Sequence, residues 1–276
     1  MSLDQLELDG LGSPIELARR IHQVAPDLPP NFAIEDVCRQ LGIETIEERP
    51  ISSFEAALTM DANQAFGSII LAEGRRPERR RFSIAHELGH FLIPMHMPGA
   101  GAGFSCSLEH LRTENPGKHD RRLRVEAEAN RFAANLLMPP DRIRSSLTSL
   151  QPGLAEIVRL AGEFGVSKEA MARGYINAHR QTLAVVMLHL GRIDRVYRSE
   201  DFPYIESWRG QPVPYDSIAF ECDLAPGQIS EMEECDPETW LGEYAVRQVE
   251  VLSEQVLVQA SGWATVLLHA EMSEET

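Results

Sequence analysis

Two histidines and a glutamate are the first side chains in this sequence whose types and spacing could do chemistry. Residues 86–90 read HELGH, so His86 and His90 are four residues apart and Glu87 follows the first histidine. On a helix, residues four apart lie on one face, so both imidazoles can bind one metal ion while Glu87 leans toward its remaining coordination position. The spacing predicts a zinc site with a glutamate base, which is a machinery for cleaving peptide bonds.

The helix that carries these residues should be buried. It is expected from Glu78 to Ile93, because Pro77 suits a first turn and Pro94 ends the pattern. Its residues around the motif are apolar on nearly every side, namely Phe82, Ile84, Ala85, Leu88, Phe91 and Leu92. The alternative is a pair of core histidines that hydrogen bonds satisfy, with the glutamate beside them by chance. Two imidazoles in so apolar a helix need a strong partner, and zinc is one. The five-residue match alone does not decide between the two, and a third ligand on another helix favours the metal.

A catalytic zinc ion has three protein ligands and one water, so a third ligand is required. A second helix, expected from about His119 to Met138, offers two glutamates. At about 100° per residue, Glu126 lies at the edge of that helix's apolar face, whereas Glu128 lies toward solvent. We therefore predict Glu126 as the ligand and keep Glu128 as the alternative. Asn130, one turn after Glu126, is expected to accept a hydrogen bond from a ligating histidine.

Other histidines and the cysteines give weaker signals. A histidine near the site in sequence could stabilise an oxyanion, and the spacing does not select among His96, His110 and His119. The four cysteines lie far apart without a C-x-x-C pair, which indicates neither a disulfide framework nor a thiolate zinc site. We expect reduced residues of the core or surface at Cys38, Cys106, Cys222 and Cys235.

The elements before the motif helix should position it. Apolar residues three and four apart predict two short helices, at residues 14–25 and 31–42. Alternation of apolar and polar residues predicts an antiparallel hairpin with strands at residues 54–60 and 66–72. The strand Gly67–Ala72 leads into the motif helix and either holds an extended substrate by β-addition or is plain sheet. Residues 99–116 are aperiodic and contain Gly, Ser and Pro, which predicts a surface loop near the site.

Beyond the second helix, the pattern becomes mainly β. We expect a helical hairpin of residues 154–163 and 167–178, followed by a β-hairpin of residues 182–190 and 193–198. A proline-containing loop at 202–238 and a final pair of strands at 244–252 and 255–272 complete the chain. The prediction is an α+β fold with two domains. Residues 1–180 should form a metallopeptidase domain with a small β-sheet, active-site helices and the helical hairpin, and residues 181–276 an acidic, mainly β region of unassigned role.

Composition and charge narrow the class of protein. Of the 276 residues, 43% are hydrophobic and 25% are charged, which excludes disordered and collagen-like chains. No segment approaches the ~18 apolar residues of a membrane span, and the first residues lack an apolar leader, so we expect a cytoplasmic protein without a membrane partner. The net charge is −16, and residues 199–276 carry 17 acidic side chains against two arginines. Direct nucleic-acid binding would need a local basic patch, such as residues 75–81 or 121–124, and is not expected.

Together, HELGH at 86–90 and EAEANRFAANLLMP at 126–139 resemble the ImmA/IrrE family of zinc metallopeptidases. The resemblance runs from Phe32 to His179 and includes RFSIA directly before the motif. It implies a zincin-like fold of the gluzincin type, with His86, His90 and Glu126 as zinc ligands and Glu87 as the catalytic residue. It also implies a cytoplasmic endopeptidase whose partner is a helix-turn-helix repressor, cut to relieve repression in transcription regulation and stress response.

Two other functions fit parts of the sequence. The helix pair at 154–178 resembles a helix-turn-helix, with Gly165 in the turn and Lys168 and Arg173 available to DNA, so one alternative is a DNA-binding regulator. The other alternative is a catalytically silent module that binds metal and a partner, although pure metal binding needs no base at Glu87. Zinc is the expected metal, and imidazole and carboxylate ligands also accept Mn²⁺ or Fe²⁺.

Overall fold

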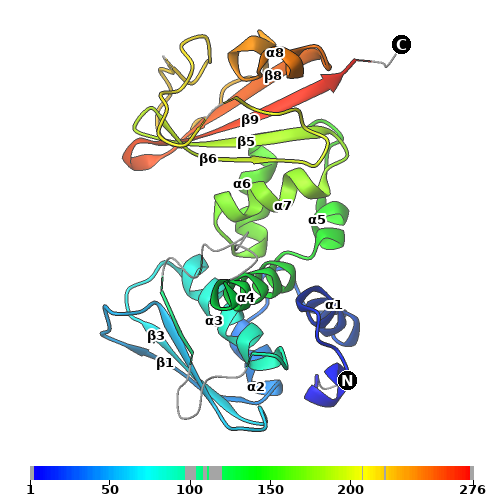
Figure 1. The fold of residues 1–276 in the computed structure, drawn as a ribbon, viewed down its shortest axis with the longest axis vertical. Helices are drawn as coiled ribbons and strands as arrows, with labels where there is room; N and C mark the ends of the chain where they lie inside the picture. The colour runs from blue at the N-terminus through cyan, green and yellow to red at the C-terminus, as the bar shows by residue number, and fades with distance from the viewer. Residues whose placement is uncertain are drawn as a thin grey trace. The chain divides into compact units, whose positions relative to one another are not determined.

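The structure is a computed structural model that describes residues 3–96, 104–107, 111, 120–206, 208–220 and 222–273. The chain has a mixed α+β fold and divides into two compact units (Figure 1). The N-terminal unit comprises residues 1–139 and 163–167, and the C-terminal unit comprises residues 140–162 and 168–276. The sequence instead predicts a boundary near residue 180, which would keep the helical hairpin with the first domain. No helix within the described ranges is long and apolar enough to cross a membrane.

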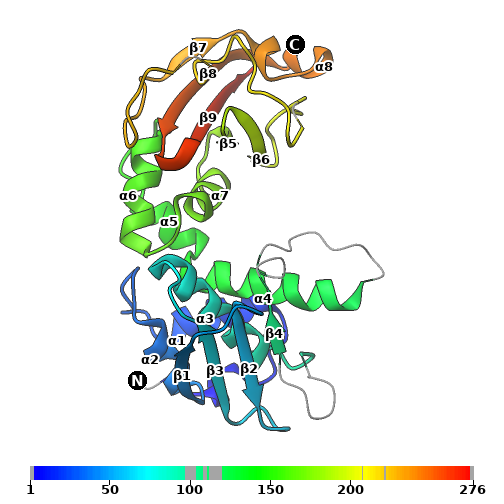
Figure 2. The same ribbon diagram turned by 90° about the vertical axis from the view of Figure 1, so that its left-hand side faces the viewer.

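A four-stranded sheet belongs to the N-terminal unit (Figure 2). Its strands, in the order β1-β3-β2-β4, are β1 (Ile43–Arg49), β3 (Gly67–Ala72), β2 (Ala56–Met60) and β4 (Phe104–Cys106). β1 runs parallel to β3, and the other neighbours are antiparallel, as predicted for β2 and β3. Because β3 is paired on both sides, Gly67–Ala72 fits the plain-sheet alternative rather than the alternative of substrate β-addition.

Two strands of this sheet have no clear pattern in the sequence. β1 is an edge strand in which only Ile43 is buried, and its charged residues remove the alternation that marks a strand. β4 has three residues and lies inside the aperiodic stretch 99–116, so its run is too short for periodicity to reveal. The sheet is therefore larger than the predicted hairpin.

Two long helices lie against each other in this unit (Figure 1). The helical elements are a 3-10 helix (Gln5–Leu8), α1 (Pro14–Val24), α2 (Ile34–Gln40), α3 (Pro77–Leu92) and α4 (Arg121–Leu137). α3 contacts β2 and β3, and α4 packs against α3 and α1. α3 has Pro77 in its first turn and ends where Ile93 becomes extended. α4 begins after Asp120, whose side chain accepts a hydrogen bond from the Leu123 N–H at 3.0 Å.

The C-terminal unit combines helices with a five-stranded antiparallel sheet of order β6-β5-β9-β8-β7. Its helices are α5 (Pro140–Ser146), α6 (Leu154–Phe164), α7 (Lys168–Ala178) and the short α8 (Glu243–Val246). Its strands are β5 (Thr182–His189), β6 (Arg192–Arg198), β7 (Glu233–Cys235), β8 (Val249–Val258) and β9 (Trp263–Met272). Single 3-10 turns lie at Pro237–Thr239 and Ala260–Gly262. The helical hairpin and the first β-hairpin agree with the predictions.

The last strand pair turns later than the sequence predicts. The predicted turn falls at residues 253–254, but β8 continues to Val258. The actual turn contains Ser261 and Gly262, both with positive φ. Glu254 is the reason for the error: it has the polar character of a turn residue but is buried within β8.

α7 packs on its own sheet rather than presenting a free basic face. The guanidinium of Arg173 lies 4.9 Å from the centre of the Tyr197 ring on β6. Glu169 accepts hydrogen bonds from Arg195 and from the hydroxyl of Tyr197, each at 2.7 Å. This packing weighs against the alternative of a DNA-binding regulator, because Arg173 is engaged by β6.

Candidate metal centre

α3 carries three of the predicted site residues into the interior. His86, Glu87 and His90 are fully buried, each with 0% of its surface exposed. Because one helical turn separates the histidines, both rings emerge on the same side, and their Nε2 atoms are 3.0 Å apart. The two imidazoles therefore converge, as the four-residue spacing predicts.

A glycine lets the second helix approach this face closely. A Cβ atom on Gly89 would lie 2.9 Å from Cδ1 of Phe132 and 3.3 Å from backbone atoms of Ala129, both on α4. With only hydrogen at this position, α3 and α4 pack tightly. The close approach brings Glu126, which is 3% exposed, to the two histidines.

Four donor atoms meet where the helices touch. Glu126 Oε2 lies 3.3 Å from His86 Nε2 and 3.5 Å from His90 Nε2. The sulfur of Cys106, on β4, lies 3.3 Å from His86 Nε2 and 3.6 Å from His90 Nε2. The same sulfur is 3.6 Å from Glu126 Oε2. All four atoms lie within 4.8 Å of one another, and no other such group occurs in the described part of the chain.

Cys106 is the member of this cluster that the sequence does not predict. We expect from its isolated position only a reduced cysteine of the core or surface. The pairing of β4 with β2, which sets Cys106 opposite Ala56, brings it to the histidines. That pairing joins segments far apart in the chain, so no local spacing reveals it. Burial raises the pKa of the Cys106 thiol, and a bound metal ion removes such a proton.

Hydrogen bonds at the far side of each ring fix how the imidazoles point. Asn130 Oδ1 lies 2.8 Å from His86 Nδ1 and accepts its hydrogen, the contact expected for Asn130. His90 Nδ1 lies 3.1 Å from His96 Nδ1, and His96 Nε2 lies 3.0 Å from Glu128 Oε2. Since the carboxylate only accepts, His96 donates from Nε2 and accepts the hydrogen of His90 at Nδ1. Both Nε2 atoms of the motif histidines are then lone-pair donors that face the cluster.

These contacts weigh against two alternatives from the sequence. Glu128, the alternative ligand, lies outside the donor cluster, and its side chain is 41% exposed. His96 is buried behind His90 with both ring nitrogens engaged, so it is not placed to stabilise an oxyanion. The other two oxyanion candidates, His110 and His119, lie outside the described residues.

The electrostatics of the cluster suit a cation. Burial acts to raise the pKa of Glu126, but its contacts with His86 and His90 hold that pKa well below the ordinary value. Burial lowers the pKa of His90 to about 3, so its ring is neutral at neutral pH. A carboxylate and neutral imidazoles are the protonation states that metal binding requires.

Glu87 supplies the clearest sign that the site takes a further group. Burial raises the pKa of Glu87 to about 7. Neither carboxylate oxygen has a hydrogen-bond partner within the described residues, although both are buried. Buried polar atoms normally find partners, and an exception is explained by a water molecule or an ion that binds there, or by a catalytic role. The residues therefore fit a metal ion with a solvent molecule or substrate beside it.

Comparison with known families points the same way. A family model described as the IrrE N-terminal-like domain, peptidase family M78, matches residues 38–174. The match contains the four clustered side chains and Glu87. The chain belongs to the ImmA/IrrE family. The match to this family runs past the boundary between the two compact units and ends within α7, so a peptidase domain of residues 1–180 stays a prediction.

The fold of this ImmA/IrrE chain resembles that of a solved structure, described as a Mycobacterium tuberculosis transcriptional regulator. The likeness has a TM-score of 0.56 at 14% sequence identity, and it covers 94% of this chain and 75% of that one. At this identity the likeness concerns the fold alone. No curated protein matches the chain.

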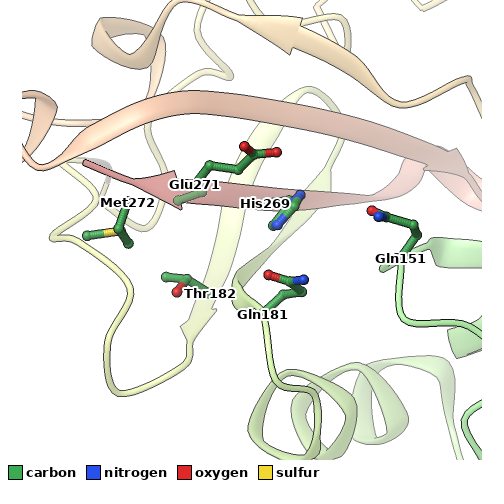
Figure 3. Close-up of a pocket in the computed structure, with 7 residues that line it drawn as sticks. Gln151, Gln181, Thr182, His269, Glu271 and Met272 are labelled. Carbon is green, nitrogen blue, oxygen red and sulfur yellow. The ribbon is translucent and has the colours of Figure 1, made fainter. Parts of the chain in front are cut away.

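A recess lies in the C-terminal unit of the ImmA/IrrE chain (Figure 3). It is lined by Gln151, Gln181, Thr182, His269, Ala270, Glu271 and Met272. His269 is 7% exposed, and its Nε2 atom has no hydrogen-bond partner within the described residues. The recess does not bring three potential metal ligands together in the part of the chain that the structure describes. We therefore place the candidate chemistry at the N-terminal cluster.

Proposed function

We propose that this chain is a zinc-dependent endopeptidase with a zincin-like catalytic core, and that it acts in the cytoplasm. The observation that carries the proposal is the unpartnered, buried carboxylate of Glu87 beside four converging metal-ligand atoms. A module that only binds metal has no use for such a base. The family assignment supports the same activity, because the matching model describes a peptidase.

Zinc is the metal that the donor set favours. Histidine, cysteine and glutamate side chains are all common zinc ligands, whereas magnesium and manganese prefer oxygen ligands. The sulfur of Cys106 therefore weighs against manganese, which the imidazole and carboxylate ligands alone leave open. When bound, zinc supplies Lewis acidity, which lowers the pKa of a water molecule to about 7 and polarises a peptide carbonyl.

The side chains of the site have three roles, namely binding the ion, orienting a ligand and transferring the proton. His86, His90 and Glu126 hold the ion, and Asn130 keeps the His86 ring oriented through Nδ1. Glu87 takes a proton from the attacking water at a carboxylate oxygen and returns it to the nitrogen of the leaving amine. Burial raises the pKa of Glu87 in the metal-free site, and the charge of a bound ion would act in the opposite direction, toward the carboxylate that accepts the proton.

The substrate proposed here is a helix-turn-helix repressor, and its cleavage would relieve repression of the genes that it controls. This part of the proposal is supported by the ImmA/IrrE membership of the chain. The repressor encoded nearest the gene is the first substrate to test. Fragments are identified by mass after incubation with the zinc-loaded protein.

The decisive variant is Glu87→Gln. It should lower the cleavage rate by about 10²–10⁴-fold, because general acid–base catalysis contributes that much, while zinc content stays at one ion per chain. Glu78→Gln is the matched control, since Glu78 lies in the first turn of the same helix and outside the donor cluster. Equal cleavage by wild type and Glu87→Gln would refute the mechanism. Zinc binding with partner capture and no cleavage by wild type would favour the silent module.

A further inference from the structure

The fourth donor of the cluster gives the site a feature that a catalytic zinc centre normally lacks. Catalytic sites keep three protein ligands and leave the fourth position to water, whereas structural sites are closed by four protein ligands. We propose that Cys106 is a displaceable fourth ligand that closes the zinc site, so that the structure represents a resting form which opens when β4 moves away. The inference rests on the proposed function, because only a catalytic site needs to open.

The distances around the sulfur match coordination of one ion. Four ligand atoms arranged tetrahedrally at about 2.0–2.3 Å from zinc lie about 3.3–3.7 Å from each other. Cys106 Sγ is 3.3 Å from His86 Nε2 and 3.6 Å from both His90 Nε2 and Glu126 Oε2. The sulfur therefore stands at the fourth corner of the group formed by the two imidazoles and the carboxylate.

A permanently closed, purely structural site does not account for Glu87. Its two carboxylate oxygens are buried without a partner next to the cluster. Burying such a group without a partner destabilises the fold, and groups of this kind are concentrated at functional sites. A closed donor set beside an unused base is the arrangement expected of a catalytic site in an inhibited state.

Cys106 is carried by a different kind of element from the other three ligands. His86, His90 and Glu126 lie on the packed helices α3 and α4, whereas Cys106 ends the three-residue strand β4. β4 lies at an edge of the sheet, where it pairs with β2 alone (Figure 2). Its departure would break this short ladder and the contacts of its own side chains, and would leave the packing of α3 on α4 intact.

Further contacts hold β4 in the closed position. The Phe104 ring stacks on the His90 ring with centroids 4.3 Å apart, and the Glu55 N–H donates to the Cys106 carbonyl at 2.9 Å. Opening breaks the sulfur–metal bond, and the sulfur then takes up a proton from solvent. No oxidant or reductant is needed, so a competing strand or ligand suffices to drive the exchange.

Cobalt substitution tests the ligation without reference to cleavage. The full chain loaded with Co²⁺ should show an intense near-ultraviolet thiolate-to-cobalt absorption band. Cys106→Ala should lose this band while still binding cobalt, and Cys222→Ser, in the C-terminal unit, should keep it. Absence of the band from the wild type would overturn the proposal, and this measurement depends on no variant that might fail to fold.

A small ligand tests whether the thiolate closes the site. Acetohydroxamate should shift the visible cobalt bands of Cys106→Ala at concentrations that leave the wild type unchanged. Equal shifts in the two proteins would show that the fourth position is already open. Alkylation of the wild type by iodoacetamide is a separate test of ligation. Bound zinc should slow the alkylation of Cys106, and equal rates with and without zinc would contradict ligation.

Cleavage then separates this inference from the proposed function. If the open form is about 0.1–10% populated, removing Cys106 should raise the cleavage rate by about 10- to 1,000-fold. Equal cleavage by wild type and Cys106→Ala would refute the closing role and leave the peptidase assignment intact. No cleavage by either protein, with the cobalt band and its loss observed, would refute the peptidase assignment and leave Cys106 as a ligand.

Discussion

Two buried glutamates, one in each unit, differ in what surrounds them. Glu87 and Glu254 are both 0% exposed, and burial raises the pKa of each. Glu254 accepts hydrogen bonds from Nε1 of Trp240, at 2.6 Å, and from the backbone N–H of Ile218. Glu87 has no such partner in the described part of the chain for either oxygen. The carboxyl group of Glu254 therefore has hydrogen-bond donors within its own unit, whereas the carboxyl group of Glu87 needs a partner that enters the site.

The difference shows that burial and a raised pKa do not by themselves mark a catalytic carboxylate. Structural groups also have perturbed pKa values, so the surroundings have to decide. Donors that satisfy the carboxyl indicate a structural role, as at Glu254. Missing donors beside converging metal ligands indicate a chemical role, as at Glu87.

The largest expected difference between the two regions is their response to zinc. Zinc at 1,000 times its Kd should stabilise the folded N-terminal unit by about 4.1 kcal/mol. The C-terminal unit should gain little. All three tryptophans, Trp208, Trp240 and Trp263, lie in that unit, so their fluorescence during urea unfolding reports on it alone. Hydrogen exchange of α3 and α4 reports on the other unit. Equal stabilisation of both units by zinc would contradict the prediction that the ion binds in the N-terminal unit alone.

The same substitution at the two carboxylates should have different effects on stability. Glu254→Gln turns an amide N–H toward the Trp240 or Ile218 donor and should lower the free energy of unfolding by about 1–3 kcal/mol. Glu87→Gln affects only the weak contact with the Cys106 thiol and removes a carboxylate whose charged form burial disfavours, so it should leave the metal-free protein as stable as wild type, or more so. Urea denaturation of both variants without metal measures the contrast. A larger loss for Glu87→Gln would mean that its carboxylate has a structural partner.

The smallest expected effect concerns a residue that acts through a ligand. Asn130→Ala should weaken zinc binding by about 10–100-fold, because it removes the acceptor for the His86 Nδ1 hydrogen. Asn135→Ala is the control, since Asn135 lies on the same helix, donates to the Arg131 carbonyl at 2.8 Å and is not a member of the donor cluster. Competition with a chelator gives both affinities. Equal affinities in the two variants would show that the His86 ring needs no such support.

The positions of site residues that depend on the helical repeat are predicted well from the sequence. His86 and His90 share one face of a helix, and the apolar face of the next helix separates Glu126 from Glu128. Both arguments use only the local geometry of 3.6 residues per turn. The start of α3 at Pro77 and the end of α4 before Pro139–Pro140 follow from another local property, the fixed φ and missing N–H of proline.

Long-range pairing accounts for what the sequence does not predict. Cys106 reaches the cluster only because β4 pairs with β2, and that register depends on the whole sheet. β1 escapes detection because an edge strand tolerates charge on both faces. Glu254 is taken for a turn residue because the donors that allow its burial, on Trp240 and Ile218, come from distant segments.

The hydrogen-bonded chain of His90, His96 and Glu128 connects the buried metal ligands to the protein surface. It forms a continuous path from a ring that solvent does not reach to a side chain that is 41% exposed. A change of charge at Glu128 alters the polarity of His96, and through it the electron donation of the His90 ring. The affinity of the interior for a cation is therefore adjustable by mutation, salt or a docked partner at the surface, without any change among the ligands themselves.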